Sequence, residues 1–179
     1  MGGFAIMAMY KTRPDLNKIR EVVKTFGQIK PSLGDSDNEI AIDVEIQNKE
    51  SINSIRLSSF DDDDVTEEEL TEVKNKLGFT PQFKICIKTW SNQLENHKNV
   101  INLVNALFTI QETYIDICAA YDPNLTSSKD KIRKSISKIK GNYWELDYET
   151  ASGESWFTHA MDEEFFKNLT SLANFRFPK

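Results

Sequence analysis

The chain has 179 residues, of which 39% are hydrophobic and 28% are charged, and its formal net charge is −6. This length suits one domain with its own core, and the composition is too apolar for a disordered chain. No apolar stretch reaches bilayer length and the start lacks a secretory pattern, so we expect a cytoplasmic protein without membrane contact. Cys86 and Cys118 each lie in an apolar run, which favours buried thiols in a reducing compartment.

The first third of the chain predicts strands and one helix. Residues 4–10 form a short apolar run before a turn, which is typical of a buried strand. Pro14 suits the first turn of a helix, apolar residues then recur at helical spacing, and Gly27 suits its C-terminal cap. Residues 39–46 alternate between apolar and polar side chains, so we expect a strand with one wet face and antiparallel neighbours. A further strand is predicted over residues 52–60.

Residues 58–73 form an acidic segment that contains eight acidic side chains and no basic one. Because these eight acids exceed the net negative charge of the chain, the remainder carries a small positive net charge. Within the segment, Thr66 and Glu69 have the spacing of a capping box, and Gly78 suits the end of the helix that follows. Helix capping and the helix dipole therefore explain the second half of the segment, whereas the aspartates before the helix have no such local reason.

The middle of the chain predicts a strand, a helix and a second strand. Residues 83–89 alternate as a strand, and residues 97–111 are apolar over more than half of the helix circumference. Residues 114–120 read as the next strand. Such a unit favours two parallel neighbouring strands joined by a right-handed crossover.

The last third predicts a basic amphipathic helix that ends at Gly141, then strands over residues 143–148 and 156–160. Asp162 suits the N-cap of a final helix. No linker separates independent domains. The sequence therefore predicts a single α/β (α+β) domain over residues 1–179, with a mixed β-sheet and helices packed on it.

The acidic segment is the leading candidate site. Its acids could steer a basic protein partner onto the surface, with Phe60 as an apolar anchor at the end of a strand. The alternative is that the segment is a solvated loop before a helix and has no binding role. Consecutive acids without the glycine of a calcium loop do not favour a metal site. The residues of this candidate partner-binding surface are Phe60, Asp61, Asp62, Asp63, Asp64, Glu67 and Glu68.

A second candidate is a pocket near the C-terminal aromatic residues, which would serve a small-molecule-binding domain or an enzyme. It would be lined by Trp144, Tyr148, Trp156 and His159. The alternative for His159 is a structural or hydrogen-bonding role. His97, the other histidine, is expected at a surface position near the start of the central helix.

Other chemistries find little support in the residues. Glycine-rich phosphate loops and a nucleophile elbow are absent, and two histidines do not supply a zinc site, so we expect neither a cofactor nor a metal. The basic helix over residues 129–140 lacks interleaved aromatic residues, which argues against nucleic acid. This helix could instead contact the acidic segment of a second copy, so the protein is expected to be a monomer or a homodimer.

Two resemblances add to this interpretation. The opening strand and proline-led helix, the central strand–helix–strand unit, and the sequence from Trp156 to Met161 resemble uncharacterised bacterial α/β domains with a C-terminal Thr-His-Gly motif. Here Ala160 stands where glycine is usual. By size, acidity and single-domain build, the chain also looks like the immunity proteins of contact-dependent and polymorphic toxin systems. That likeness implies a non-enzymatic cytoplasmic protein that binds and blocks one cognate toxin domain.

Overall fold

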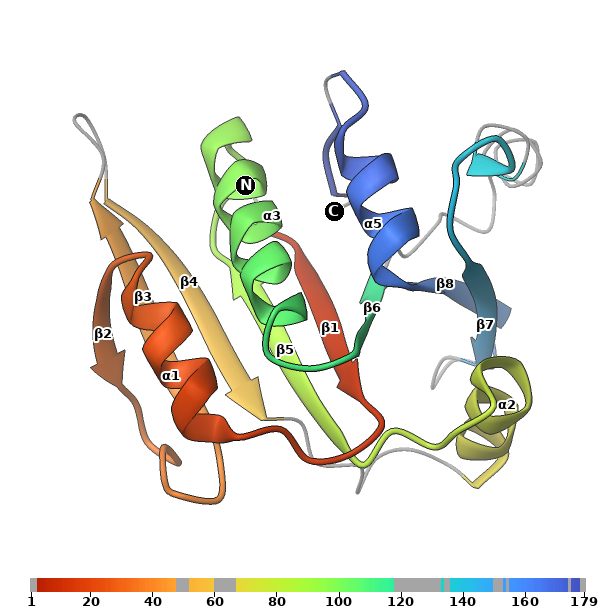
Figure 1. Cartoon of the computed structure of the whole chain (residues 1–179), viewed down its shortest axis with the longest axis horizontal. Coiled ribbons are helices and arrows are strands. Elements are labelled where there is room, and N and C mark those ends of the chain that lie inside the picture. Colours follow the sequence, from red (N-terminus) through yellow and green to blue (C-terminus); the bar gives the residue numbers. More distant parts are fainter. Residues whose placement is uncertain are drawn as a thin grey trace.

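Eight strands form one sheet in the computed structural model, which describes residues 3–47, 52–59, 67–117, 133, 136–149, 153, 155–173 and 175–177. The strand order is β2-β3-β4-β5-β1-β6-β8-β7, so β2 and β7 are the two edges (Figure 1). The strands are β1 (Ala5–Tyr10), β2 (Gln28–Pro31), β3 (Ala41–Gln47), β4 (Ile52–Ser59), β5 (Phe83–Thr89), β6 (Thr113–Ile117), β7 (Tyr143–Glu149) and β8 (Ser155–Met161). The helices are α1 (Leu16–Lys24), α2 (Glu67–Leu77), α3 (Leu94–Phe108) and α5 (Glu163–Thr170).

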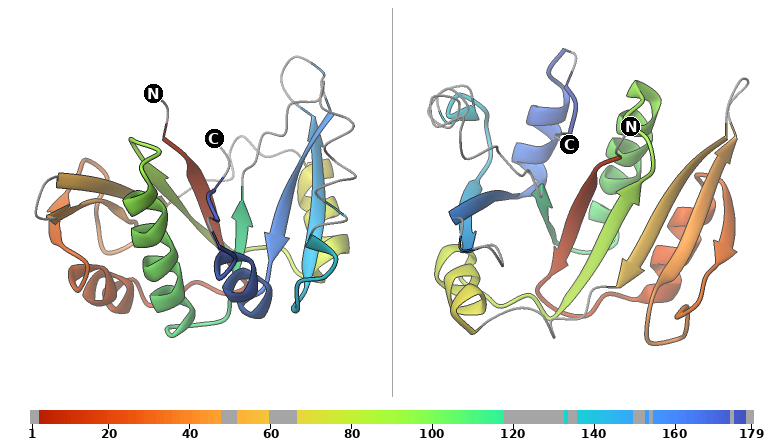
Figure 2. Two further views of the ribbon diagram at one scale, coloured as in Figure 1. Left: turned by 90° about the horizontal axis from the view of Figure 1, so that it is seen from above. Right: turned by 180° about the vertical axis from the view of Figure 1, so that it is seen from behind.

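The helices lie on both faces of the sheet. α1, α3 and α5 cover one face, which we call the core face, and α2 lies on the other face near β7, which we call the α2 face (Figures 1 and 2). The two faces follow from the alternation of side chains along each strand. Ile42 and Val44 of β3, for example, are buried on the core face, whereas Asp43 between them is half-buried on the other.

The main core lies between the sheet and these three helices. Its strand residues are the apolar halves of the alternating patterns, and its helix residues recur at spacings of three and four. The helix contribution comes from Leu16, Ile19 and Val23 of α1, from Val100, Leu103, Val104 and Leu107 of α3, and from Phe165 and Phe166 of α5. This arrangement confirms the α+β class and the packing of helices on a sheet.

The sheet differs from the prediction in the direction of its strands. Every pairing among the described strands is antiparallel, so the sheet is not of the mixed kind. β5 and β6, the expected parallel neighbours, are separated by β1, which pairs with both of them. The crossover through α3 therefore skips one strand position, which the local pattern of the two strands does not encode.

Other elements depart from their predicted positions in smaller ways. β2 was not expected, and it is short and exposed at three of its four residues. α1 ends at Lys24 with Thr25 as its C-cap, two residues before Gly27. Gly78 follows α2 with a φ of 77°, a left-handed conformation that favours glycine, as predicted. Of the predicted basic helix over residues 129–140, residues 129–132, 134 and 135 lie outside the described residues, and residues 137–140 form a turn and a bend and not a helix.

His97 is a clear correction, because its side chain is fully buried and not at the surface. The backbone N–H of Phe177 donates to Nδ1 of His97 at 2.9 Å, so Nε2 carries the proton and donates to Oδ1 of Asn92 at 2.7 Å. The ring stacks on Phe4, with 4.4 Å between the ring centroids. Burial lowers the pKa of His97, with a smaller contribution from Arg176, so the ring is neutral. The imidazole joins both ends of the described chain to α3.

Among the described residues, no helix has the length and apolar character needed to cross a membrane.

Candidate functional site

The structure places only part of the predicted acidic surface. Phe60 and the four aspartates Asp61 to Asp64 lie outside the described residues, as does the predicted N-cap Thr66. Glu67 is the first residue of α2 and is exposed, whereas Glu68 belongs to the same helix but its side chain is outside the description. The predicted helix is therefore present, and it begins where the acidic segment turns from aspartate to glutamate.

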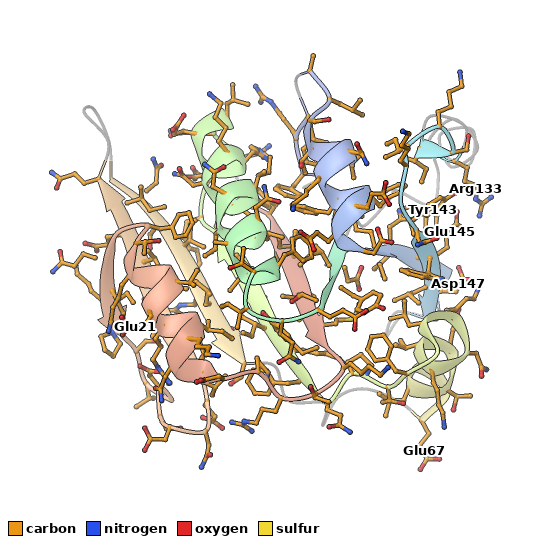
Figure 3. The ribbon with its side chains drawn as sticks, viewed as in Figure 1. Glu21, Glu67, Arg133, Tyr143, Glu145 and Asp147 are labelled. Atoms are coloured by element: carbon orange, nitrogen blue, oxygen red, sulfur yellow. The ribbon has the colours of Figure 1, made fainter. Side chains whose placement is uncertain are left out.

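α2 is held on the α2 face by a small apolar cluster. Val73 and Leu77 of the helix pack with Leu146 of β7, and this cluster is separate from the main core. Burial of one face leaves the opposite side of α2 free to carry polar residues. Figure 3 shows Glu67 at the foot of α2, on the side of the molecule opposite Glu21 of α1. The acidic segment thus continues into a helix that is attached to one end of the sheet.

A polar contact also links α2 to the edge strand. The carboxylate Oε1 of Glu72 accepts a hydrogen bond from the backbone N–H of Asp147 at 3.1 Å. Along the same side of α2 there is an open hollow of about 520 Å³. It is lined by Glu67, Thr71, Glu72, Asn75 and Lys76. Sequence reasoning missed the link between Glu72 and β7, because the two partners are 75 residues apart.

The second candidate pocket is not assembled by the fold. Trp144 pairs with Ala160 in the β7–β8 ladder, and its ring lies on the α2 face near Tyr114, with centroids 5.7 Å apart. His159 pairs with Glu145, one position along, so it lies on the core face. Trp144 and His159 therefore face opposite sides of the sheet. The backbones of Tyr148 and Trp156 are paired with each other, and their side chains lie outside the described residues.

His159 lies in an aromatic and charged cluster on the core face. Its side chain is buried between the rings of Tyr143 and Phe157, at centroid distances of 5.7 and 5.2 Å. Nε2 of His159 is 3.7 Å from Oε1 of Glu145. Arg133 donates from Nε and Nη2 to the two oxygens of Glu145, each at 2.7 Å (Figure 3). These contacts hold the imidazole of His159 in a fixed position within the protein.

The charges of this cluster favour a neutral histidine. Burial lowers the pKa of His159, and it outweighs the opposite influence of Glu145. The guanidinium of Arg133 is the main cause that lowers the pKa of Glu145, so the carboxylate stays ionised. A neutral ring closed in by two aromatic side chains has little access to a substrate, and the arrangement supports a structural role.

A second acidic hollow of about 450 Å³ lies at the start of α5. Several of its acids already have partners within the protein. Asp162 caps α5 by accepting from the backbone N–H of Phe165 at 2.8 Å, and Glu112 accepts from the hydroxyl of Tyr114 at 3.0 Å. Lys167 forms an ion pair with Glu163. These contacts account for the local concentration of acids through helix capping and surface ion pairs.

Cysteine and metal chemistry find no site in the part of the chain that the structure describes. Groups of three or more metal-ligating side chains are absent from these residues. Burial raises the pKa of Cys86, which disfavours a reactive thiolate, and Cys118 lies outside the described residues. Burial also raises the pKa of Asp116 to about 6, with Thr158 donating to its Oδ2 at 3.0 Å.

Fold and surface together define an α+β protein with an open antiparallel sheet and an acidic helix beside one edge strand. The comparison with protein families agrees with a single unit, since one family model, a family of unknown function (DUF6368), matches residues 6–179. The chain belongs to the DUF6368 family. No curated protein and no solved structure matches it.

Proposed function

We propose that this chain is an immunity protein, a cytoplasmic binding protein that neutralises a cognate bacterial toxin domain through its acidic surface. The observation that carries the proposal is the position of the acidic segment. It leads into α2, which is attached to one end of the sheet, away from α1, and exposes Glu67 beside an open hollow.

The charge distribution supports a partner of basic character. Eight acids lie within residues 58–73, while the rest of the chain carries a small positive net charge. A local negative potential of this kind raises the rate of encounter with a basic surface and disfavours acidic ones. Spread over the whole molecule, the same net charge would serve mainly solubility. Concentration in one segment favours recognition.

The structure also supplies a support for such a surface. Glu67 and Glu72 belong to a helix whose apolar side packs with Leu146 and Trp144, so the backbone that carries them is set by packing. Fixed charges lose less conformational entropy on binding than charges on a free loop. Phe60, next to the four aspartates in sequence, would add an apolar anchor to an otherwise polar contact.

The test uses the toxin domain encoded by the gene that neighbours the gene of this chain. Its association rate with the wild-type chain is compared with that of a variant in which Asp61, Asp62, Asp63 and Asp64 are all changed to Asn. A matched control changes four exposed acids elsewhere, Glu21→Gln, Glu95→Gln, Glu163→Gln and Glu164→Gln, and so removes the same number of charges.

We expect the aspartate variant to associate about 10- to 100-fold more slowly at low salt, because local steering is lost. The control should stay within about threefold of wild type, since its acids lie on α1, α3 and α5 and not in the acidic segment. Equal reductions of the association rate in the two variants would show that the rate depends on net charge alone and not on the acidic segment. A neighbouring gene that encodes no toxin, or a toxin domain that does not bind, would contradict the proposal.

A further inference from the structure

The two edges of the sheet differ in how they are protected. β2 has four residues, ends in Pro31 and pairs Lys30 with Glu45 across the strands at 2.6 Å. Short length, proline and lysine are the usual devices that prevent a further strand from adding to an edge. β7 has seven residues and contains neither proline nor lysine. It is therefore the edge with the stronger capacity to accept another strand.

The direction of the backbone groups of β7 follows from two hydrogen bonds. The carbonyl of Asn142 accepts from the N–H of Asp162 at 3.0 Å, so the backbone of residue 142 faces β8. The N–H of Asp147 instead donates to Glu72, outside the sheet. Since backbone groups alternate along a strand, Tyr143, Glu145 and Asp147 all direct their N–H and C=O groups away from β8. These groups form a row along the open edge.

Glu72 occupies the place that the carbonyl of a neighbouring strand would take. Its carboxylate contacts the backbone of Asp147 at 3.1 Å, which is a main-chain donor normally satisfied by a sheet partner. Within the described residues, this is the single hydrogen bond made to the outward backbone groups of Tyr143, Glu145 and Asp147. A side chain can rotate away, so this bond can be exchanged for a bond from an incoming strand.

α2 lies directly beside this edge strand. The helix packs on β7 through the cluster around Leu146, and the hollow of about 520 Å³ lies along the side of α2 that carries Glu72. An exposed strand edge next to a helix is the geometry in which extended peptides bind by strand addition. The charged side chains at this edge include Glu72 of α2, Asp147 of β7 and Glu145, which is paired with Arg133 (Figure 3). Glu67 and Lys76 line the hollow together with Glu72, so acids outnumber bases there.

We propose that a basic, extended segment of the partner protein adds to the sheet along β7, beside α2. This inference rests on the proposed function and names the way in which the partner binds. The main chain of the segment pairs with Tyr143, Glu145 and Asp147, and the carboxylate of Glu72 is released to contact lysine or arginine side chains. Alternate residues of the segment then face α2, where the acids select positive charge.

The test uses a capped ten-residue peptide in which lysine alternates with threonine or valine. Binding is followed by amide chemical shifts and by hydrogen exchange of the chain. We expect shifts in β7 and α2, and at least about tenfold slower exchange of the amides of Glu145 and Asp147, because strand pairing protects them. The same peptide with glutamate in place of lysine should not bind.

Two N-methylated peptides provide the matched control, since they have the same charge. One carries methyl groups on the odd residues and the other on the even residues, so each loses the N–H groups along one side of the strand. Strand addition predicts that one peptide loses binding by at least about tenfold and the other retains it. Equal binding of both would overturn the inference, as would the absence of binding by the unmethylated lysine peptide at millimolar concentration.

The two proposals fail in different ways. If the toxin domain binds and is weakened by the aspartate variant, while β7 stays unprotected, the proposed function stands and strand addition is wrong. If the toxin domain does not bind at all, the proposed function is wrong whatever the peptides do.

Discussion

The two ends of the sheet are completed in different ways. At the β2–β5 end, contacts of Arg20 and His97 tie the loop after β2 and the C-terminal segment to α1 and α3. Arg20 of α1 holds the loop after β2 through Asp35 at 2.7 Å and the backbone carbonyls of Ser36 and Glu39, and His97 holds Phe177. At the β6–β8–β7 end, polar contacts such as that of Glu72 lie at the surface. The contacts of the first end stabilise the fold, whereas the second end is where we propose that a partner replaces surface contacts.

The largest expected effect is at His97. His97→Ala removes the acceptor of the Phe177 N–H and the ring that stacks on Phe4, and it should lower the free energy of unfolding by about 3 kcal/mol. Lys98→Ala, at the next and exposed position of α3, is the control and should change it by less than about 0.5 kcal/mol. Denaturant titration measures both. Equal effects would show that the His97 contacts do not hold this end together.

Two arginines provide the next comparison. Arg20→Ala leaves two backbone carbonyls and Asp35 without their shared donor and should cost about 2 kcal/mol, since the side chain is largely buried. Arg133→Ala should cost less than about 1 kcal/mol, because the ion pair of Arg133 with Glu145 is half-exposed and screened by solvent. Denaturant titration of each variant gives these two changes in the free energy of unfolding. An equal or larger cost at Arg133 would remove the contrast between the two ends.

The pH dependence of His97 is a smaller effect with a defined sign. Its folded-state pKa is lowered by burial, so its contribution to stability is present above the unfolded pKa near 6.5 and is lost as the pH falls through the folded value. The imidazole resonances of His97 should titrate below pH 6.5, together with the amide of Phe177. Asp116, whose pKa is raised to about 6, acts in the opposite direction, so stability alone does not isolate His97. A midpoint above 6.5 would contradict the neutral buried ring.

The smallest effect concerns Glu72. Glu72→Ala removes the acceptor of the Asp147 N–H and should speed hydrogen exchange of that amide by about three- to tenfold, while Glu72→Gln retains an acceptor oxygen and should not. The free energy of unfolding should change by less than about 1 kcal/mol in either variant. Unchanged exchange of the Asp147 amide in Glu72→Ala would mean that Glu72 does not protect this amide.

Local patterns in the sequence predicted most helices and strands, because periodicity and capping act over a few residues. The surface position expected for His97 was wrong although a signal existed, since His97 lies three residues before Val100 and seven before Val104, a spacing that predicts burial on the same side. The order of the strands was not readable, because it depends on contacts between distant segments. For the same reason the sequence did not separate Trp144 from His159, which requires the register of β7 on β8.

The most direct test of the central claim is hydrogen exchange of the whole chain with and without the toxin domain. We expect slower exchange in Tyr143–Glu149 of β7 and Glu67–Leu77 of α2, with Gln28–Pro31 of β2 unchanged. Protection confined to the β2–β5 end, with β7 and α2 unchanged, would contradict it.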